Sequence, residues 1–309
     1  MSVAAATAFH SGFVSILGRP NAGKSTLLNA LVGGKLAIVS EKPQTTRTAI
    51  EGVVNLPGSA QIVFLDTPGI HASGSLLNRR MMDTVRTSLA DRDLLLYLSD
   101  STARFGPDDI QALEILKDLS TPAFLLLTKV DRLSDKRLLL PRIEECKAVR
   151  EFADYVPISA VTGEGLDQLR KAIVERLPEG PAYFPADYLT DQPERFLGAE
   201  LIRERILRET RQEVPHAVAV VVDEWKDQPK LLRISATIYV ERPGQKAIVI
   251  GAKGATLKKI GTLARQEMET MFSRKIFLEL FVKVRKDWRE SPEFLNAIDW
   301  RAMRGRESE

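Results

Sequence analysis

The chain has 309 residues, 44% of them hydrophobic and 28% charged, so it can bury a full core and is longer than one typical domain. One cysteine excludes an internal disulfide, and no apolar run reaches the roughly 18 residues of a membrane span, so we expect a soluble, cytoplasmic protein of two domains. The net charge of +3 says little about partners, but residues 242–289 hold 12 basic and 4 acidic residues, which suggests an anionic partner at that place.

Between residue 12 and about residue 177, short apolar runs alternate with amphipathic helical patterns. The runs are "GFVSILG", "QIVFLDTPG", "DLLLYLSD", "AFLLLTKVD" and "YVPISA", and each ends at a polar or glycine-rich turn. This pattern is typical of an α/β domain with a mostly parallel sheet and helices on both faces. Functional sites in such sheets lie at the carboxyl ends of the strands, so we expect the polar residues after these runs to form one pocket.

The first turn, "GRPNAGKST" at residues 18–26, follows a strand, precedes a helix and fits the pattern G-x-x-x-x-G-K-[ST]. Its glycines let backbone N–H groups surround phosphates, Lys24 reaches the β and γ phosphates, and Ser25 ligates Mg²⁺. A chance glycine turn seldom has this strand and helix around it, so the turn predicts a nucleoside triphosphate site. The residues expected to line it are Gly18, Arg19, Pro20, Asn21, Ala22, Gly23, Lys24, Ser25 and Thr26.

The second turn, "DTPG" at residues 66–69, follows the apolar strand "QIVFL". Asp66 can approach the metal from this strand, and the N–H of Gly69 can sense the γ phosphate, with Thr67 and Pro68 between them. Alone, the same four residues would be read equally well as an ordinary turn. Placed after a phosphate loop, they predict the metal side of the site.

Two later strand ends decide which base is bound. In "TKVD", residues 128–131, the carboxylate of Asp131 can accept both the N1–H and the exocyclic amine of guanine, a donor pair that adenine does not present. In "ISA", residues 158–160, the backbone N–H of Ala160 can reach the guanine O6. The sequence therefore predicts GTP rather than ATP. The expected base-pocket residues are Thr128, Lys129, Asp131, Ser159 and Ala160.

These motifs resemble the G1, G3, G4 and G5 motifs of the translation-factor-related GTPases. The segment "PQTTRT" resembles their G2 switch, in which Thr46 would ligate Mg²⁺ and move with the nucleotide state; Thr45 is the alternative, and a plain surface loop also fits. The resemblance implies Lys24, Thr46, Asp66 and Gly69 as catalytic residues, and Ser25, Thr46 and Asp66 as Mg²⁺ ligands.

The sequence departs from this family pattern at two positions. Thr128 replaces the usual asparagine, so we expect a weaker tie between the base loop and the phosphate loop and a modest nucleotide affinity. Ile70 stands where Ras-like members have the glutamine that positions the attacking water, so we expect slow intrinsic hydrolysis.

After residue 177 the pattern changes. Residues 177–194 contain four prolines without helical periodicity and predict a linker with extended segments. Beyond it come an amphipathic helix, "ERFLGAELIRERILRET", and strands "LRISATIYV" and "KIFLELFVKV" with alternating apolar residues. The residues expected to face the core are Ile234, Ala236, Ile238 and Val240 in the first strand and Ile276, Leu278, Leu280, Val282 and Val284 in the second. These elements predict a small α+β domain.

A second glycine turn, "GAKG" at residues 251–254, leads into a helical pattern but lacks a following G-K-[ST], so it is not another phosphate loop. KH domains use a G-x-x-G turn between helices to clamp the backbone of about four single-stranded nucleotides. A structural turn is the alternative. The KH interpretation is favoured by the stretch 242–265, which is basic and contains no acidic residue. The predicted RNA-binding residues are Gly251, Ala252, Lys253, Gly254, Lys246, Lys258 and Lys259.

The helix-first order resembles a type II KH domain, and a GTPase domain followed by such a domain resembles the Era family of bacterial GTPases over essentially the whole chain. The expected organisation is a GTPase domain at 10–178, a linker at 179–194, a KH domain at 195–290 and a C-terminal helix and tail at 291–309. The resemblance implies GTP, GDP and Mg²⁺ as cofactors, and a K⁺ ion held by Asn21, although an ordinary loop asparagine is the alternative. It also implies binding to 16S ribosomal RNA near its 3′ end, assembly of the small ribosomal subunit, and peripheral association with the cytoplasmic face of the cell membrane.

The leading hypothesis is an RNA-binding GTPase switch, and two other classes compete with it. A tRNA-modification GTPase would need a second catalytic domain with cysteine or folate chemistry, of which the residues after the GTPase domain show no sign. A membrane-associated switch would use the basic stretch 242–265 to bind anionic lipid, and its G-x-x-G turn would then be incidental.

Overall fold

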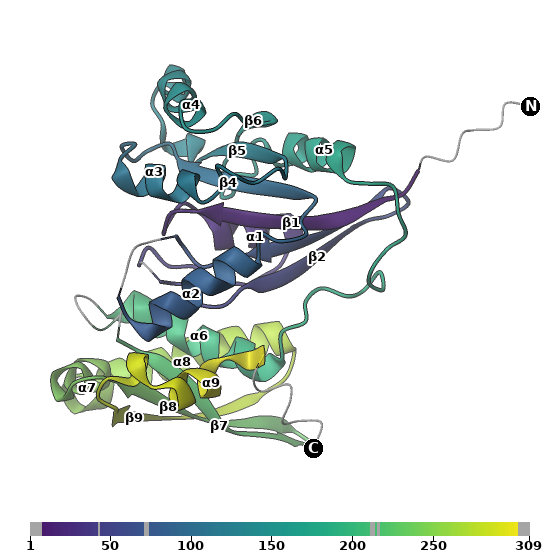
Figure 1. Ribbon diagram of the computed structural model, residues 1–309. Helices are drawn as coiled ribbons and strands as arrows, with labels where there is room; N and C mark the ends of the chain where they lie inside the picture. The colour runs from purple at the N-terminus through teal and green to yellow at the C-terminus, as the bar shows by residue number, and fades with distance from the viewer. Residues whose placement is uncertain (1–7, 43, 71–73, 211–213, 215–216, 302–309) are drawn as a thin grey trace, which may run out of the picture. The chain divides into compact units, whose positions relative to one another are not determined.

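The computed structural model describes residues 8–42, 44–70, 74–210, 214 and 217–301 (Figure 1). It divides into two compact units, and each unit combines segments that are far apart in the sequence. The first comprises Met1–Ala37, Thr46–Ala72 and Met81–Asp191, and the second comprises Ile38–Thr45, Ser73–Arg80 and Gln192–Glu309. No helix in the described part of the chain is both long enough and apolar enough to cross a membrane.

The first unit contains a six-stranded sheet in the order β2-β3-β1-β4-β5-β6. Strands β2 and β3 are antiparallel and the other neighbours are parallel, which confirms the predicted mostly parallel sheet. The strands are β1 His10–Gly18, β2 Ile50–Leu56, β3 Ala60–Asp66, β4 Leu94–Asp100, β5 Ala123–Thr128 and β6 Asp154–Pro157. The predicted turns all follow strand ends: the phosphate loop follows β1, "DTPG" follows β3, and the two base-loop segments follow β5 and β6.

Helices cover both faces of this sheet, because successive side chains of each strand point to opposite faces. The helices are α1 Lys24–Val32, α2 Leu76–Thr87, α3 Pro107–Glu114, α4 Leu139–Lys147 and α5 Leu166–Arg176. In β4, Leu94, Leu96 and Leu98 pack with side chains of α1 and α5, whereas Leu95 and Tyr97 pack with those of α2, α3 and α4. Two apolar cores result, one on each face.

Residues 179–191 contain no helix and run beside the edge strand β2. The Val53 N–H donates to the carbonyl of Leu189 (2.8 Å), and the Thr190 hydroxyl donates to the carbonyl of Glu51 (2.7 Å). The segment therefore pairs part of the exposed edge of the sheet.

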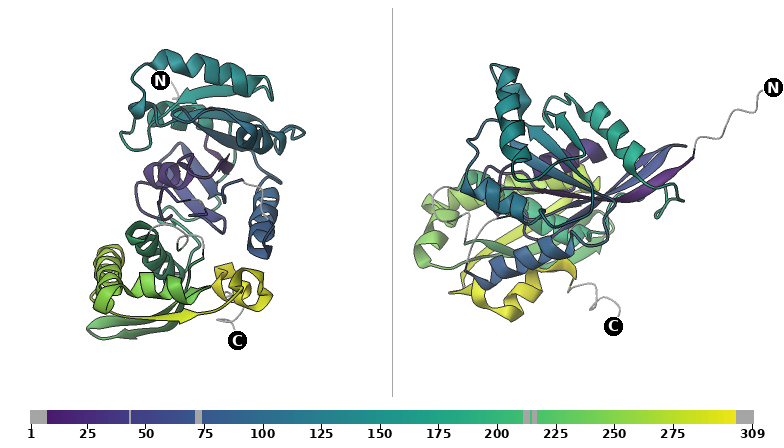
Figure 2. Two further views of the ribbon diagram at one scale, coloured as in Figure 1. Left: turned by 90° about the vertical axis from the view of Figure 1, so that its left-hand side faces the viewer. Right: turned by 45° about the horizontal axis from the view of Figure 1, so that its top comes forward.

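The second unit contains a three-stranded sheet with helices packed on one face (Figure 2). Strand β7 (Ala219–Gln228) is antiparallel to β8 (Leu231–Val240), and β8 is parallel to β9 (Ile276–Val284). The helices are α6 Glu194–Glu209, α7 Pro243–Ile250, α8 Ala255–Phe272 and α9 Pro292–Ile298. This order, helix-strand-strand-helix-helix-strand, confirms the predicted α+β domain.

The core of the second unit lies between its sheet and the helices α6 and α8. The predicted inward residues of β8 are fully buried, and Ile202, Ile206, Ile260 and Met268 pack against them from the helices. In β9 the prediction fails at one residue: Val284 is 41% exposed. It is the last residue of the edge strand β9, where the alternation continues in the sequence but the side chain is exposed.

Candidate functional site

The predicted phosphate loop has backbone angles that suit its glycines. Gly18 and Gly23 have φ values of 147° and 99°, a region that side chains rarely adopt. A Cβ on Gly18 would lie 2.6 Å from the carbonyl oxygen of Leu98 on the neighbouring strand. The loop therefore turns tightly between β1 and α1, and its backbone N–H groups lie at the start of a helix.

Lys24, the first residue of α1, reaches back over the loop. Its Nζ donates to the carbonyls of Gly18 (3.1 Å) and Arg19 (2.9 Å), and the side chain is buried. Burial lowers the pKa of Lys24 to about 8, and the attraction of Asp66 offsets part of that effect. A buried ammonium group that donates to backbone carbonyls is suited to take a phosphate as its counterion.

Three oxygen side chains meet beside Lys24. The Ser25 hydroxyl donates to Asp66 Oδ2 (2.6 Å), and the Thr46 Oγ1 lies 2.8 Å from Ser25 Oγ and 3.3 Å from the same carboxylate oxygen. Burial raises the pKa of Asp66 to about 6, against the lowering effects of Lys24, Ser25 and Thr46. Asp66 Oδ1 is buried and has no hydrogen-bond partner among the residues that the structure describes. Two hydroxyls and a carboxylate with an unused oxygen form a hard donor set that suits Mg²⁺.

The "DTPG" turn packs directly against the phosphate loop. The N–H of Ile70 donates to the carbonyl of Gly18 (3.3 Å), and a Cβ on Gly69 would lie 2.9 Å from the Cα of Pro20. Glycine is required at position 69 by this close approach. The Ile70 side chain is buried in the core with Leu17, so it fills space in the protein.

Thr128 ties the base loop to the phosphate loop despite its departure from the family pattern. Its hydroxyl donates to the carbonyl of Ala22 at 2.8 Å and lies 3.3 Å from the carbonyl of Ser99. A short side chain is sufficient because the end of β5 lies close to the loop after β1. We expected a weaker link between these two loops, and the structure shows that threonine forms a hydrogen bond between them.

The other base-loop residues lie at the ends of β5 and β6, which are hydrogen-bonded neighbours. Lys129 has a left-handed backbone conformation (φ 60°), and its Nζ forms an ion pair with Asp100 Oδ2 at 2.6 Å. Burial would raise the pKa of Asp100, but hydrogen bonds from Lys129 and Thr102 keep it below its usual value. Asp131 is exposed in the following turn, so its carboxylate is accessible.

The segment after β6 is fixed by its own turn. The Ser159 side chain accepts from the N–H of Thr162 (3.1 Å), and the Ser159 N–H donates to the carbonyl of Glu164 (2.9 Å). The N–H of Val130 in turn donates to the carbonyl of Ile158 (3.3 Å). These bonds bring the two predicted base-binding segments together.

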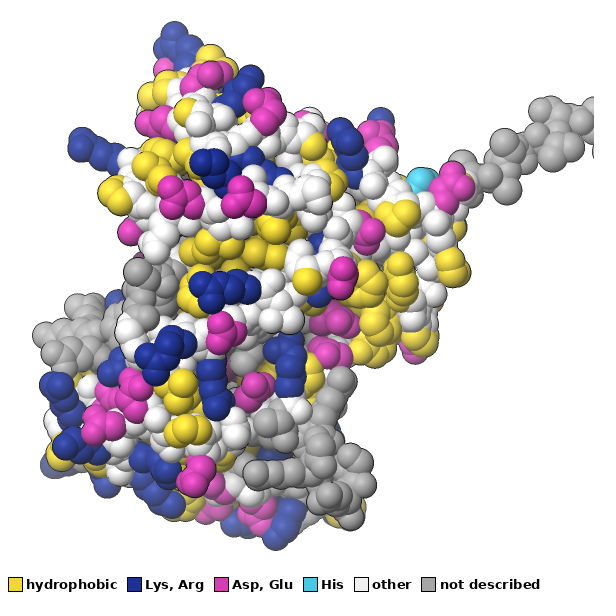
Figure 3. All heavy atoms as spheres, viewed as in Figure 1, with side chains coloured by type: hydrophobic (Ala, Val, Ile, Leu, Met, Phe, Trp, Pro, Cys, Tyr) yellow, Lys and Arg dark blue, Asp and Glu magenta, His cyan; other side chains and the backbone are white. Residues whose placement is uncertain are grey.

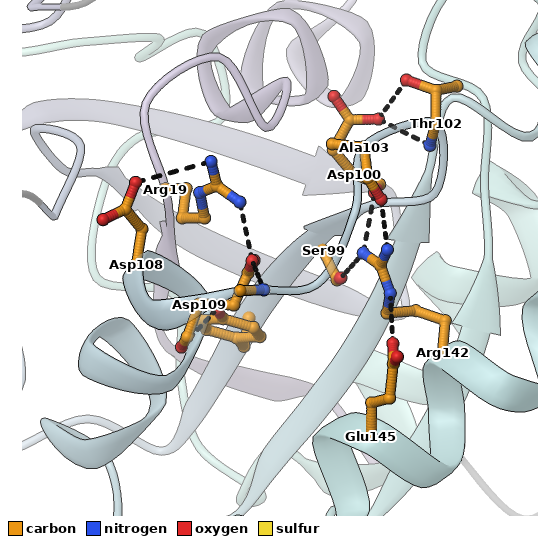
Figure 4. Close-up of polar contacts among 11 residues, drawn as sticks. Arg19, Ser99, Asp100, Thr102, Ala103, Asp108, Asp109, Arg142 and Glu145 are labelled. Carbon is orange, nitrogen blue, oxygen red and sulfur yellow. Dashed lines mark hydrogen bonds and ion pairs between the residues drawn. The ribbon is translucent and has the colours of Figure 1, made fainter.

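Two arginine contacts supporting this edge were not predicted from the sequence. Figure 4 shows that Arg19 of the phosphate loop points toward α3, where its guanidinium forms an ion pair with Asp109 at 2.6 Å. Asp109 also accepts from the N–H of Gly106 (3.0 Å), so it caps α3 and holds the arginine at once. The sequence offers only an acidic pair, Asp108 and Asp109, which lies in the first turn of α3 and which helix capping alone would explain.

The buried side chain of Arg142 in α4 makes the second unpredicted contact. Its guanidinium donates to Ser99 Oγ (3.1 Å), to the carbonyl of Asp100 (2.9 Å) and to the carbonyl of Ala103 (Figure 4). It therefore fixes the end of β4, where Asp100 meets Lys129. An arginine on an amphipathic helix gives no sequence signal of this role.

In the second unit, the "GAKG" turn connects α7 to α8. Gly251 and Gly254 have φ values of 71° and 80°, and a Cβ on Gly251 would lie 2.1 Å from Thr256 Oγ1. Ala252 and Lys253 between them are exposed. The turn thus presents small residues and one lysine to the surface, as a backbone clamp requires.

Basic side chains surround this turn. Lys258 and Lys259 are exposed on the first turns of α8, and Lys246 is partly exposed on α7. Lys259 also forms an ion pair with Glu209 of α6 at 2.6 Å. Figure 3 shows Lys and Arg side chains at the surface around α7, in the lower left of the view. The predicted RNA-binding residues therefore share one region of the second unit.

Comparison with known proteins identifies both units. Residues 13–129 match a family model described as 50S ribosome-binding GTPase, and residues 213–289 match a KH domain model. GTPase Era from Geobacter metallireducens is 50% identical, with 94% of this chain and 98% of that protein covered. GTPase Era from Syntrophus aciditrophicus is 51% identical, with coverages of 94% and 95%.

Two solved structures match over nearly the same length. A variant of Aquifex aeolicus Era bound to GDP and AlF4⁻ has a TM-score of 0.91 and 42% identity and covers 94% of this chain and 99% of its own. Era in complex with MgGDPNP and nucleotides 1506–1542 of 16S ribosomal RNA gives the same TM-score, identity and coverage. The predicted fold is confirmed by these matches, and the chain is a GTPase that belongs to the Era family.

Proposed function

We propose that this chain is a GTP-dependent switch that binds the 3′ end of 16S ribosomal RNA and acts in assembly of the small ribosomal subunit. The proposal assigns residues 10–178 to the GTPase domain, 179–194 to a linker, 195–290 to a type II KH domain and 291–309 to a C-terminal helix and tail. Residues 302–309 lie outside the described part of the chain. The observation that carries the proposal is the pairing of one phosphate loop and one G-x-x-G turn, supported by the solved Era complex with this RNA.

The nucleotide would be held by the residues that meet at the carboxyl edge of the first sheet. Lys24 and the loop N–H groups would bind the phosphates, and Ser25, Thr46 and Asp66 would hold Mg²⁺, whose bound charge neutralises the negative charge that develops on the transferred phosphoryl group. The N–H of Gly69 would sense the γ phosphate. Ile70 offers no polar group to orient water, so we expect slow hydrolysis in the absence of a partner.

Crosslinking in cells tests the RNA partner. Nucleotides crosslinked to residues 242–265 are expected to map near the 3′ end of 16S ribosomal RNA. Crosslinks concentrated on transfer RNA would instead support a tRNA-modification role. Peripheral membrane association stays a prediction. Sedimentation with anionic vesicles, in the presence and absence of competing RNA, tests it. Cytoplasmic localisation with no vesicle binding would contradict it.

The base preference is expected to depend on Asp131. Changing Asp131→Asn replaces a carboxylate acceptor with an amide, which should weaken GTP binding about 10- to 50-fold because two hydrogen bonds to a charged group are lost. Binding of xanthosine triphosphate should improve, since its 2-oxo group accepts from the new amide. The measurement is nucleotide affinity, with Asp118→Asn on the exposed surface of the same domain as control. An unchanged GTP affinity would remove Asp131 from the base pocket.

A potassium ion held by Asn21 is expected to accelerate hydrolysis. Asn21 is exposed and has φ 64°, so a substitution by alanine would add backbone strain, whereas Asn21→Gly removes the side chain and keeps the conformation. Turnover of the wild type should be faster in potassium than in sodium buffer, and Asn21→Gly should abolish the difference. Equal rates for the wild type in both buffers would refute the potassium site.

A further inference from the structure

A buried arginine of the first unit lies behind the base loop and has no part in the function proposed above. Arg142 of α4 has a side chain that is 9% exposed, and its guanidinium meets the end of β4 (Figure 4). The ends of β4 and β5 are in register, with Asp100 opposite Thr128, and the N–H of Ser101 donates to the carbonyl of Thr128 at 3.1 Å. The turn after β4 therefore sets the position of the peptide that leads into Lys129.

Arg142 fixes this turn at three points. Its guanidinium donates to Ser99 Oγ (3.1 Å) and to the carbonyl of Asp100 (2.9 Å), and also to the carbonyl of Ala103. The N–H of Ala103 in turn donates to the carbonyl of Asp100 at 3.3 Å. Glu145 of the same helix balances the charge from 3.1 Å. One planar guanidinium, with its donors in a fixed fork, thus holds both ends of the turn.

The turn orients the carboxylate of Asp100. One oxygen, Oδ1, accepts from the N–H (2.9 Å) and the hydroxyl (2.7 Å) of Thr102, and the other, Oδ2, accepts from Lys129 Nζ at 2.6 Å. Burial alone would raise the pKa of Asp100, but the hydrogen bonds from Lys129 and Thr102 hold it below its usual value. The carboxylate is therefore charged at neutral pH, and its fixed oxygen holds the lysine in one place.

Lys129 connects this network to the base-binding carboxylate. Its backbone is left-handed, with φ 60°, a conformation that a lysine adopts only where the surroundings hold it. It is also the N-cap of the short helical turn Val130–Arg132, which carries Asp131. The N–H of Arg132 donates to the carbonyl of Lys129 at 3.0 Å and closes this turn. The conformation of Lys129 therefore sets the direction in which the turn leaves β5.

We propose that Arg142 is a positioning residue for guanine recognition. By holding the turn after β4 it keeps Asp100 against Lys129, and the fixed conformation of Lys129 directs Asp131 toward the base. The inference deepens the proposed function and rests on it, because it takes Asp131 as the acceptor for guanine. Arg142 acts through its neighbours and does not touch the nucleotide, so its loss should weaken the choice of base.

The test compares the affinities for GTP and inosine triphosphate in the wild type and in Arg142→Lys. Inosine triphosphate keeps the N1–H of the base but lacks the exocyclic amine, so the ratio of the two affinities reports the second hydrogen bond to Asp131. Lysine keeps a positive charge beside Glu145 but cannot reach three acceptors with a planar fork. The preference for GTP should fall about 3- to 10-fold, as expected for a weakened hydrogen bond. Amide hydrogen exchange at residues 101–103 and 129–132 should become faster.

A second variant tests the same route without changing a buried arginine. Asp100→Asn keeps the shape of the side chain and an acceptor for Thr102, but it removes the charge that faces Lys129. It should lower the preference for GTP by a similar factor, and adding Arg142→Lys should lower it little further, because both changes act through one contact. Additive losses would overturn this route. If Arg142→Lys does not fold, an Asp100→Asn protein with the wild-type preference overturns the proposal by itself.

Arg150→Lys is the matched control. Arg150 belongs to the same unit, and its guanidinium also donates to three backbone carbonyls, those of Leu116, Leu119 (3.1 Å) and Thr121 (2.8 Å). These residues precede β5 and so lie at the other end of this strand from the base loop. The variant removes a similar set of contacts and should keep the wild-type preference for GTP.

The positioning role and the proposed function fail in different ways. A folded Arg142→Lys protein with the wild-type preference for GTP would overturn the positioning role. A preference lost equally in Arg150→Lys would show a general effect of destabilisation and would overturn that role as well. A wild-type protein that binds GTP no better than inosine triphosphate would instead overturn the base pocket of the proposed function, and the role of Arg142 would fall with it.

Discussion

Replacing Lys24 by alanine is expected to reduce GTP hydrolysis by about 10² to 10³-fold, the cost of removing one buried donor that stabilises transition-state charge. Lys24 is 6% exposed, and its ammonium group lies over the phosphate loop and donates to the carbonyls of Gly18 and Arg19, so alanine removes a buried positive charge from this loop. GTP affinity should fall as well, because a charge-assisted hydrogen bond to phosphate is lost.

The fold should tolerate this substitution. Burial lowers the pKa of Lys24 to about 8, which means that the charged form is disfavoured in the folded state relative to the unfolded one. At pH 7 the lysine is still mainly protonated, so its burial costs stability, and this cost decreases as the pH rises from about 8 toward the unfolded-state pKa of 10.5. The Lys24→Ala protein without nucleotide is therefore expected to unfold at an equal or higher temperature.

The measurements are turnover, nucleotide affinity and thermal unfolding. Lys117→Ala, at an exposed position after α3, serves as the control and should behave as the wild type. Turnover that survives in Lys24→Ala would remove this residue from the site.

Local motifs allow a nucleotide site to be predicted from the sequence. The phosphate loop, Asp66 and Asp131 could be assigned to this predicted site because each depends on a short spacing after an apolar strand, and parallel strands bring their carboxyl ends to one edge. The alternation in β8 was predictable for the same reason. Val284 shows the limit, because the pattern alone does not reveal where the covering helices end.

The supporting contacts depend on tertiary structure and had no local signal. Arg19 meets Asp109, and Arg142 meets the end of β4, only because helices from later in the chain pack beside the site. Thr128 also shows the role of tertiary structure. The change from asparagine to threonine suggested a weaker link between the base loop and the phosphate loop. The backbones of these loops lie close enough for the short Thr128 hydroxyl to reach the carbonyl of Ala22.

Placing aspartates at Ala252 and Lys253 is expected to weaken RNA binding about 100-fold while leaving GTP binding intact. The change adds two negative charges and removes one positive charge at the exposed turn where a phosphate backbone would approach most closely. Fewer counterions are then released, so the dependence of affinity on salt should flatten, with a slope smaller by about 1.

The structure indicates that this double variant will fold. Ala252 and Lys253 are exposed, Gly251 and Gly254 are retained, and Lys253 has φ 50°, a conformation that aspartate adopts more readily than lysine. GTP affinity should survive because Lys24, Ser25, Thr46 and Asp66 all belong to the other unit.

The control carries the same change of charge at the opposite end of β8. Gln228→Asp with Lys230→Asp places one aspartate at the exposed last residue of β7 and one in the exposed turn before β8, so it reproduces any effect of net charge without touching the G-x-x-G turn. The measurement is affinity for a 16S RNA 3′-end fragment at two salt concentrations, alongside GTP affinity, for both variants and the wild type. If the control loses as much affinity as the Ala252/Lys253 variant, the effect comes from overall electrostatics. If neither loses any, the G-x-x-G turn does not bind RNA, and the basic stretch 242–265 must serve another anionic partner.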